Sequence, residues 1–209
     1  ALSFHQDLSN WDVSNVRNMS GMFHDAQLFG STKQPQTTNS SAPAAATTGL
    51  SKWNVSNVEN MSNMFYYAKN FNDDISNWDV SSVRNMGHMF HKASSFNQPI
   101  GKWNVSNVSD MNSIFSHAQM FQQDVSSWNV SNVVDMSFMF SFTQNFNSSL
   151  SSWNVSNVKD MNSMFLNALQ FNNGCCHNSS DDKDEKQNNA IVTSSKSSSS
   201  SLSSWDVSN

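Results

Sequence analysis

Apolar residues recur along this chain with a period of 25 residues. The evenly spaced tryptophans are Trp53, Trp78, Trp103, Trp128 and Trp153. Trp11 lies 42 residues before this series and Trp205 lies 52 residues after it, so each outer gap equals one period plus an insertion. The pattern therefore predicts a repeat protein with six complete units, the last over 153–171, and the start of a seventh.

The first half of each unit is an apolar pattern centred on tryptophan. In the unit that contains Trp78, Ile75 lies three residues before the tryptophan, and Val80 and Val83 lie two and five residues after it. Alternation of Trp and Val places both side chains on one face of an extended segment. We therefore predict a short strand here, with Trp and Val facing the core and the polar residues between them facing outward.

The second half of each unit carries a different spacing. An Asn or Asp precedes an invariant Met in all six units, as Asn60 precedes Met61. The apolar residues that follow, Met61, Met64, Phe65 and Ala68, lie at i, i+3, i+4 and i+7, which is typical of one helical face. Because Asn and Asp are preferred N-cap residues, the pattern predicts a capped helix of about two turns, stable only when packed.

A unit of strand, turn and short helix cannot bury its apolar face alone, so the units must stack. The predicted fold class is α/β, a solenoid of strand-turn-short-helix units in which the Trp, Val, Met and Phe columns form a continuous core. The expected divisions are a first repeat, a low-complexity disordered insertion, five contiguous repeats, a second such insertion and the start of a truncated repeat. Their ranges are 1–29, 30–49, 50–171, 172–201 and 202–209. Neither end resembles a capping repeat, so we expect a fragment of a longer array.

Composition excludes several classes of protein. Only 13% of the residues are charged, and Ser (42) and Asn (30) supply most of the polar surface. No apolar run approaches the roughly 18 to 20 residues that span a bilayer, so no transmembrane segment is expected. Eleven Lys and Arg scattered among sixteen Asp and Glu form no basic stripe, so we expect no nucleic-acid partner.

Catalytic and metal-binding patterns are weak. No nucleophile is paired with a base and no Gly-rich phosphate loop is present, so we predict no enzyme activity, no cofactor and no metal. The adjacent Cys175 and Cys176 with His177 lack a paired ligand spacing. The column of Asp110, Asp135 and Asp160 is interpreted as helix caps. The remaining candidates are interpreted as surface residues that do not converge: His24, His88, His91 and His117.

The repeated FNxDISxWDVSxVxNMxxMFxxAxxF, nearly complete from Phe71 to Phe96, resembles the BspA-like leucine-rich-repeat surface proteins. The same 25-residue repeat occurs in mycoplasma-type lipoproteins of that family, and the resemblance covers all of the chain except the two insertions. It implies a leucine-rich-repeat-like solenoid, with Leu8, Trp11 and Val13 in the strand. The sequence departs from the leucine-rich-repeat pattern at Val16, which occupies the position where such repeats usually have the asparagine of a buried asparagine ladder. The resemblance also implies an extracellular or cell-surface location, and some members are adhesins.

The predicted outward strand face is a regular polar lattice, and we take it as the candidate binding face. Solenoids commonly bind partners along such an extended face, although Ser and Asn can also serve only as a hydrogen-bonded, soluble surface. The candidate residues are Asp12, Asn54, Asp79, Asn104, Asn129, Asn154, Ser56, Ser81, Ser106, Ser131 and Ser156. Four of the asparagines lie in NxS sequons, so glycans would cover this face if the chain were glycosylated.

These observations predict a non-enzymatic repeat protein that mediates protein–protein interaction or adhesion through this face, with a matrix or cell-surface protein as its ligand. Two alternatives stay open. A binder of a glycan polymer or other periodic surface would also use the regular Ser and Asn columns. A structural spacer would use none of them.

Overall fold

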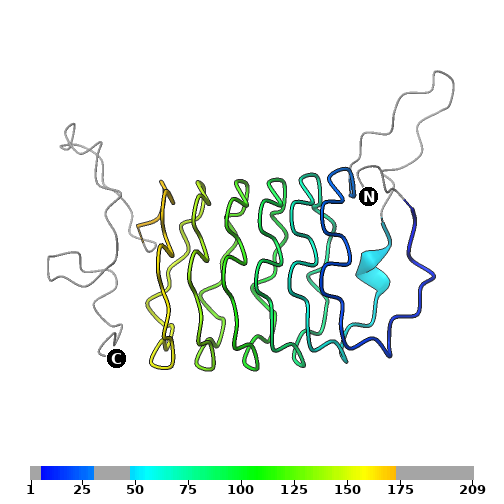
Figure 1. Cartoon of the computed structure of the whole chain (residues 1–209), viewed down its shortest axis with the longest axis horizontal. Helices are drawn as coiled ribbons and strands as arrows, with labels where there is room; N and C mark the ends of the chain where they lie inside the picture. The colour runs from blue at the N-terminus through cyan, green and yellow to red at the C-terminus, as the bar shows by residue number, and fades with distance from the viewer. Residues whose placement is uncertain (1–5, 31–47, 173–209) are drawn as a thin grey trace, which may run out of the picture.

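The computed structural model describes residues 6–30 and 48–172. In these two ranges the chain forms a row of coils that lie side by side, with the unit of residues 6–30 at one end (Figure 1). Five parallel β-bridges link the same position of six successive coils, from Asn18 with Asn60 to Asp135 with Asp160. The insertions and the truncated repeat expected within 30–49 and 172–209 fall almost wholly outside the described residues.

The secondary structure within the coils differs from the prediction. Across the described ranges, the one helix is the 3-10 turn η1 at Leu50–Lys52, and the bridges are isolated residues that do not extend into strands. The predicted α/β, leucine-rich-repeat-like solenoid of strands and short helices is therefore wrong. Each coil is instead a chain of turns that pairs with its neighbours at single positions.

The segment after each invariant Met is not a helix because its backbone N–H groups point in two directions. Met61, Asn63 and Phe65 donate to carbonyl oxygens of the next coil at 2.9 Å each. Met64 donates within its own coil, three residues back, to Met61 at 3.2 Å. Asn63 (φ 57°) and Tyr67 (φ 60°) are left-handed, which an α-helix does not allow. The apolar spacing therefore arises from successive turns and not from a helix.

The segment around each tryptophan forms no ladder in the described coils. Its backbone bonds are local, for example from Trp78 N–H to the Ile75 carbonyl at 3.1 Å and from Val83 to Val80 at 2.9 Å. Pairing between coils begins only near the Asn or Asp before the Met, where Arg84 N–H donates to the Glu59 carbonyl at 2.8 Å. A strand requires consecutive pairing, so none forms.

The core follows the predicted columns closely. The Phe four residues after each invariant Met and the Phe that closes each unit lie face to face, as Phe65 and Phe71 do at a centroid distance of 3.7 Å. Phe90 continues this row from Phe65 at 5.6 Å in the next coil. Most of these rings are fully buried, together with the Met and Val columns. The prediction that the Trp, Val, Met and Phe columns form a continuous core is confirmed for the described coils.

The Asn or Asp before each Met uses its side chain as an N-cap residue does, although no helix follows. Its Oδ1 accepts the backbone N–H two residues later, as in Asn60 with Ser62 at 2.9 Å and Asp110 with Asn112 at 2.9 Å. This is an Asx turn. The interpretation of Asp110, Asp135 and Asp160 as helix caps is therefore wrong, because no helix follows them. The hydrogen bond that it implied, from a backbone N–H to the side-chain oxygen, is present.

Candidate functional site

The candidate binding face forms one continuous strip across the coils, which we call the Asx–Ser strip. It consists of an exposed Asn or Asp one residue after each Trp and the Ser two residues further on. The structure places the predicted residues in six adjacent coils: Asp12, Asn54, Ser56, Asp79, Ser81, Asn104, Ser106, Asn129, Ser131, Asn154 and Ser156.

Each Asn or Asp of the strip closes its own Asx turn. Its Oδ1 accepts the backbone N–H of the Ser two residues later, at 3.0 Å in Asp79 with Ser81 and 3.2 Å in Asn104 with Ser106. The Asp12 carboxylate also accepts the Ser14 hydroxyl at 2.6 Å. Hydrogen bonds from the serines lower the pKa of Asp12 and of Asp79. The strip thus holds its polar groups in fixed positions.

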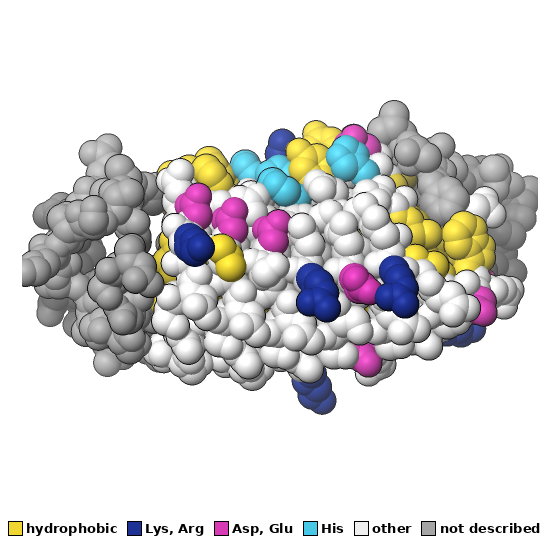
Figure 2. Space-filling model, turned by 60° about the horizontal axis from the view of Figure 1, so that its bottom comes forward, with side chains coloured by type: hydrophobic (Ala, Val, Ile, Leu, Met, Phe, Trp, Pro, Cys, Tyr) yellow, Lys and Arg dark blue, Asp and Glu magenta, His cyan; other side chains and the backbone are white. Residues whose placement is uncertain are grey.

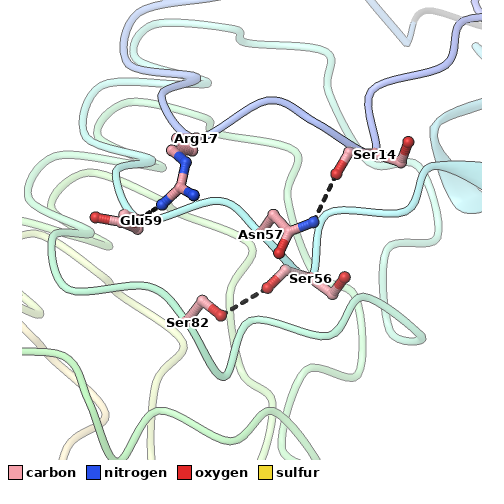
Figure 3. Close-up of polar contacts among 6 residues, drawn as sticks. All are labelled: Ser14, Arg17, Ser56, Asn57, Glu59 and Ser82. Atoms are coloured by element: carbon pink, nitrogen blue, oxygen red, sulfur yellow. Dashed lines mark hydrogen bonds and ion pairs between the residues drawn. The ribbon is translucent and has the colours of Figure 1, made fainter.

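A second row of side chains joins the strip of one coil to the next. The Asn57 amide donates to the Ser14 carbonyl at 2.8 Å, and the Ser82 hydroxyl donates to the Ser56 carbonyl at 2.6 Å (Figure 3). Nearby, Arg17 pairs with Glu59 at 2.7 Å. This row uses the position before the Val, and the Val itself packs inward, fully buried in Val58 and Val83 and partly buried in Val16.

A hollow opens on the strip between the coils of Trp128 and Trp153. It is shallow and open, and it is lined mainly by Ser127, Asn129, Ser152 and Asn154. Ser127 and Ser152 donate their hydroxyls to carbonyl oxygens of the preceding coils at 2.8 Å. This hollow offers fixed polar groups to a partner and is open to solvent.

The geometry of the described residues does not support any of the candidate metal ligands. Among residues 6–30 and 48–172, no three His, Cys, Asp or Glu side chains are placed to hold a metal ion. Cys175, Cys176 and His177 lie outside the described residues.

No helix within residues 6–30 and 48–172 is long and apolar enough to cross a bilayer.

The histidines do converge, contrary to the sequence interpretation. We call this row, His24, Tyr66, His88, His91, His117 and Phe142, the aromatic edge. His24 stacks on Tyr66 at 4.6 Å, and Tyr66 stacks on His91 at 4.7 Å. His91 meets His117 edge-on at 5.7 Å. Figure 2 shows histidine side chains gathered with hydrophobic ones along one border of the molecule.

Burial and charge both act on the middle of this edge. His91 is half-buried, and its burial, followed by the nearby His88, Lys92 and His117, lowers its pKa to about 4. The pKa of His117 is lowered by burial and by Lys92. The imidazole of His91 is therefore neutral near pH 7.

The sequence did carry one signal for the aromatic edge. The positions two, five and six residues after the invariant Met change in chemical type from unit to unit, whereas the strip positions do not. At the sixth position, for example, the successive residues are Asp25, Tyr67, Lys92, His117, Phe142 and Asn167. Repeat positions whose residue type varies in this way mark the surface on which the coils differ chemically from one another.

The chain matches a family described as "Mycoplasma protein of unknown function, DUF285" over residues 1–42, 36–132 and 102–205. No curated protein and no solved structure matches it. The match confirms the mycoplasma-type part of the sequence resemblance, and it does not extend to BspA-like leucine-rich repeats. With three overlapping matches that span nearly all of its length, this repeat-containing chain belongs to the DUF285 family.

Proposed function

We propose that this chain is a non-enzymatic repeat protein of the extracellular space or cell surface that binds a partner protein through the Asx–Ser strip. The observation that carries the proposal is the Asx turn in every coil, seen in Asp79 with Ser81 and in Asn129 with Ser131. A side chain that is already fixed loses little conformational entropy on binding, so a row of them favours association.

The shape of the strip favours a macromolecular ligand. The hollow near Ser127 and Ser152 is open, and the Asx turns of the strip repeat in all six described coils. An extended surface of this kind suits a protein partner that contacts several coils. Uniform composition is also compatible with a periodic ligand, so a glycan polymer is retained as the second candidate.

The test changes the outward group of the strip without breaking the Asx turn. Asp79 forms the same turn as Asn104, so Asn104→Asp with Asn129→Asp replaces two amides by carboxylates and keeps the local fold. The full chain and this variant are screened against immobilised extracellular-matrix proteins and glycans. We expect the full chain to bind a matrix protein and the variant to bind it about tenfold or more weakly.

The control carries the same change in net charge at another surface. Arg84→Gln with Lys159→Gln alters two exposed side chains outside the strip, and we expect it to bind as the full chain does. Equal loss in both variants would mean that only net charge matters, which contradicts the proposal. Competition by free sugar would select the glycan polymer, and no binding by any form would select the spacer.

A further inference from the structure

The aromatic edge, together with Tyr67 and Lys92 that follow Tyr66 and His91 in the chain, places bulky side chains on a left-handed backbone. Tyr67, His88, Lys92, His117 and Phe142 all have positive φ, between 57° and 60°. Left-handed geometry is unfavourable for a non-glycine residue, yet these positions are left-handed in other coils too, where they hold smaller residues such as Asn63, Ser113 and Ser163. Gly21 occupies the same position as His88 in its own coil, at φ 65°. The backbone conformation therefore does not explain the bulky side chains, which vary from coil to coil.

The middle of the aromatic edge is also locally basic on an acidic chain. Lys69 and Lys92 hold their ammonium groups over the Tyr67 ring, at 4.6 and 5.4 Å from its centroid. The segments 61–72, 86–97 and 111–122 contain no Asp or Glu, whereas the whole chain has a net charge of −5. Among the described residues neither lysine forms a salt bridge. Charge complementarity therefore favours an anionic partner.

Two imidazoles add unused hydrogen-bonding capacity to the same place. The Nδ1 atoms of His88 and His91 are buried and have no hydrogen-bond partner among the described residues. Buried polar atoms without partners are costly and uncommon in folded proteins. The packing of the described residues thus leaves two ring nitrogens of this edge unmatched.

The stacking determines which anionic partner fits. A sugar packs against the open face of an aromatic ring, yet here Tyr66 lies between His24 and His91, so both of its faces are covered. The edge continues instead into apolar surface, where Phe142 stacks on His117 at 4.3 Å and Phe138 is 37% exposed. Adjacent basic and apolar surfaces match a chain that carries both carboxylates and apolar side chains.

We propose that the aromatic edge binds an acidic peptide segment of a partner protein, with carboxylates at Lys69 and Lys92 and apolar side chains against Phe138 and Phe142. This surface is separate from the Asx–Ser strip and does not depend on the function proposed for it. Because Lys69 is exposed and Lys92 is partly exposed, added salt screens their charges and weakens binding.

The test measures fluorescence anisotropy of a labelled short peptide of alternating Glu and Leu, titrated with the full chain. Lys69→Glu with Lys92→Glu should weaken binding about tenfold or more. The matched control, Arg84→Glu with Lys159→Glu, makes the same change in net charge at exposed positions away from the edge and should leave the affinity within about twofold. Equal weakening by both variants would overturn the proposal.

Further binding measurements distinguish an acidic peptide from other classes of partner. A peptide of alternating Glu and Ser should bind more weakly, because it lacks the apolar contact. Binding of heparin with no binding of the Glu–Leu peptide would overturn the proposal in favour of an anionic polysaccharide. Thermal unfolding followed by tryptophan emission checks that each variant folds. If the double Glu variant does not fold, Lys69→Gln with Lys92→Gln decides the question, and unchanged affinity in that variant overturns the proposal.

Discussion

The indole N–H of Trp78 donates to the carbonyl oxygen of Leu50 in the preceding coil at 2.9 Å. The same bond joins Trp53 to Leu8 and Trp103 to Ile75. The tryptophan column therefore does more than fill the core, because it also ties each coil to the one before it.

Trp78→Phe should destabilise the protein by about 2 to 4 kcal/mol. The substitution keeps an aromatic ring but leaves a void, and it removes the donor from the buried Leu50 carbonyl. Urea unfolding followed by the emission of the remaining tryptophans measures the loss. Trp11, which is 54% exposed at the end of the row, provides the control. A loss for Trp11→Phe as large as for Trp78→Phe would contradict the role assigned to the bond.

The exposed row of side chains between coils gives a second prediction. The Asn132 amide donates to the Ser106 carbonyl at 2.8 Å, and in another coil the hydroxyl of Ser82 makes the equivalent bond to Ser56. Asn132→Ser should therefore be tolerated, whereas Asn132→Asp should cost about 1 kcal/mol or more because a carboxylate has no N–H to donate. Thermal unfolding of the two variants checks this, and the reverse order of stability would refute it.

The repeat, the core columns and the exposed polar strip could all be predicted, because burial depends only on which positions are apolar. The local backbone could not. Met61, Met64, Phe65 and Ala68 are all fully buried, as one face of a helix would be, but a series of turns buries the same four side chains. A two-turn helix gains too little from its own hydrogen bonds to prevail over pairing with the next coil. Periodicity alone does not distinguish these two outcomes.

The left-handed positions provide a direct test of that backbone. Ser163 has φ 54°, and Gly21 occupies the equivalent position with φ 65°. Ser163→Gly should raise the free energy of unfolding by about 0.5 to 1 kcal/mol, and Ser163→Val should lower it by a similar amount or more. In a helix the order would be reversed, because glycine is a poor helix former. Urea unfolding of both variants distinguishes the two backbones.

The aromatic edge was missed because its histidines occupy different positions in their units. His88 lies two residues after the invariant Met, His91 five and His117 six. Positions two, five and six are nevertheless related as i, i+3 and i+4, so even on the predicted helix they would share one face. The rings do meet along that face, as His88 and His91 show at 5.8 Å. The histidines were judged by their place in the repeat and not by the face that these places share, and a comparison of faces would have found the edge.

The same edge predicts how stability depends on pH. The pKa of His91 falls from its ordinary value of 6.5 to about 4 in the folded chain. Above pH 6.5 the ring is neutral in both states and has no effect. Between pH 6.5 and about 4 the unfolded chain binds a proton that the folded chain does not, so stability falls as pH falls. His117 acts in the same direction because its pKa is also lowered.

His91→Phe should remove most of this dependence, because phenylalanine keeps the stacking on Tyr66 and has no proton to bind. The ring of His91 is only half-buried, so solvent screens part of the effect, and we expect the wild-type chain to lose about 1 to 2 kcal/mol between pH 6.5 and 4 through this residue. Urea unfolding across that range gives the two slopes. Carboxylates such as Asp79, whose pKa is lowered by its hydrogen bonds from Ser81, contribute equally to both proteins and cancel in the comparison of the two slopes. Equal slopes in the two proteins would show that the His91 ring is not held out of water by its neighbours in the edge.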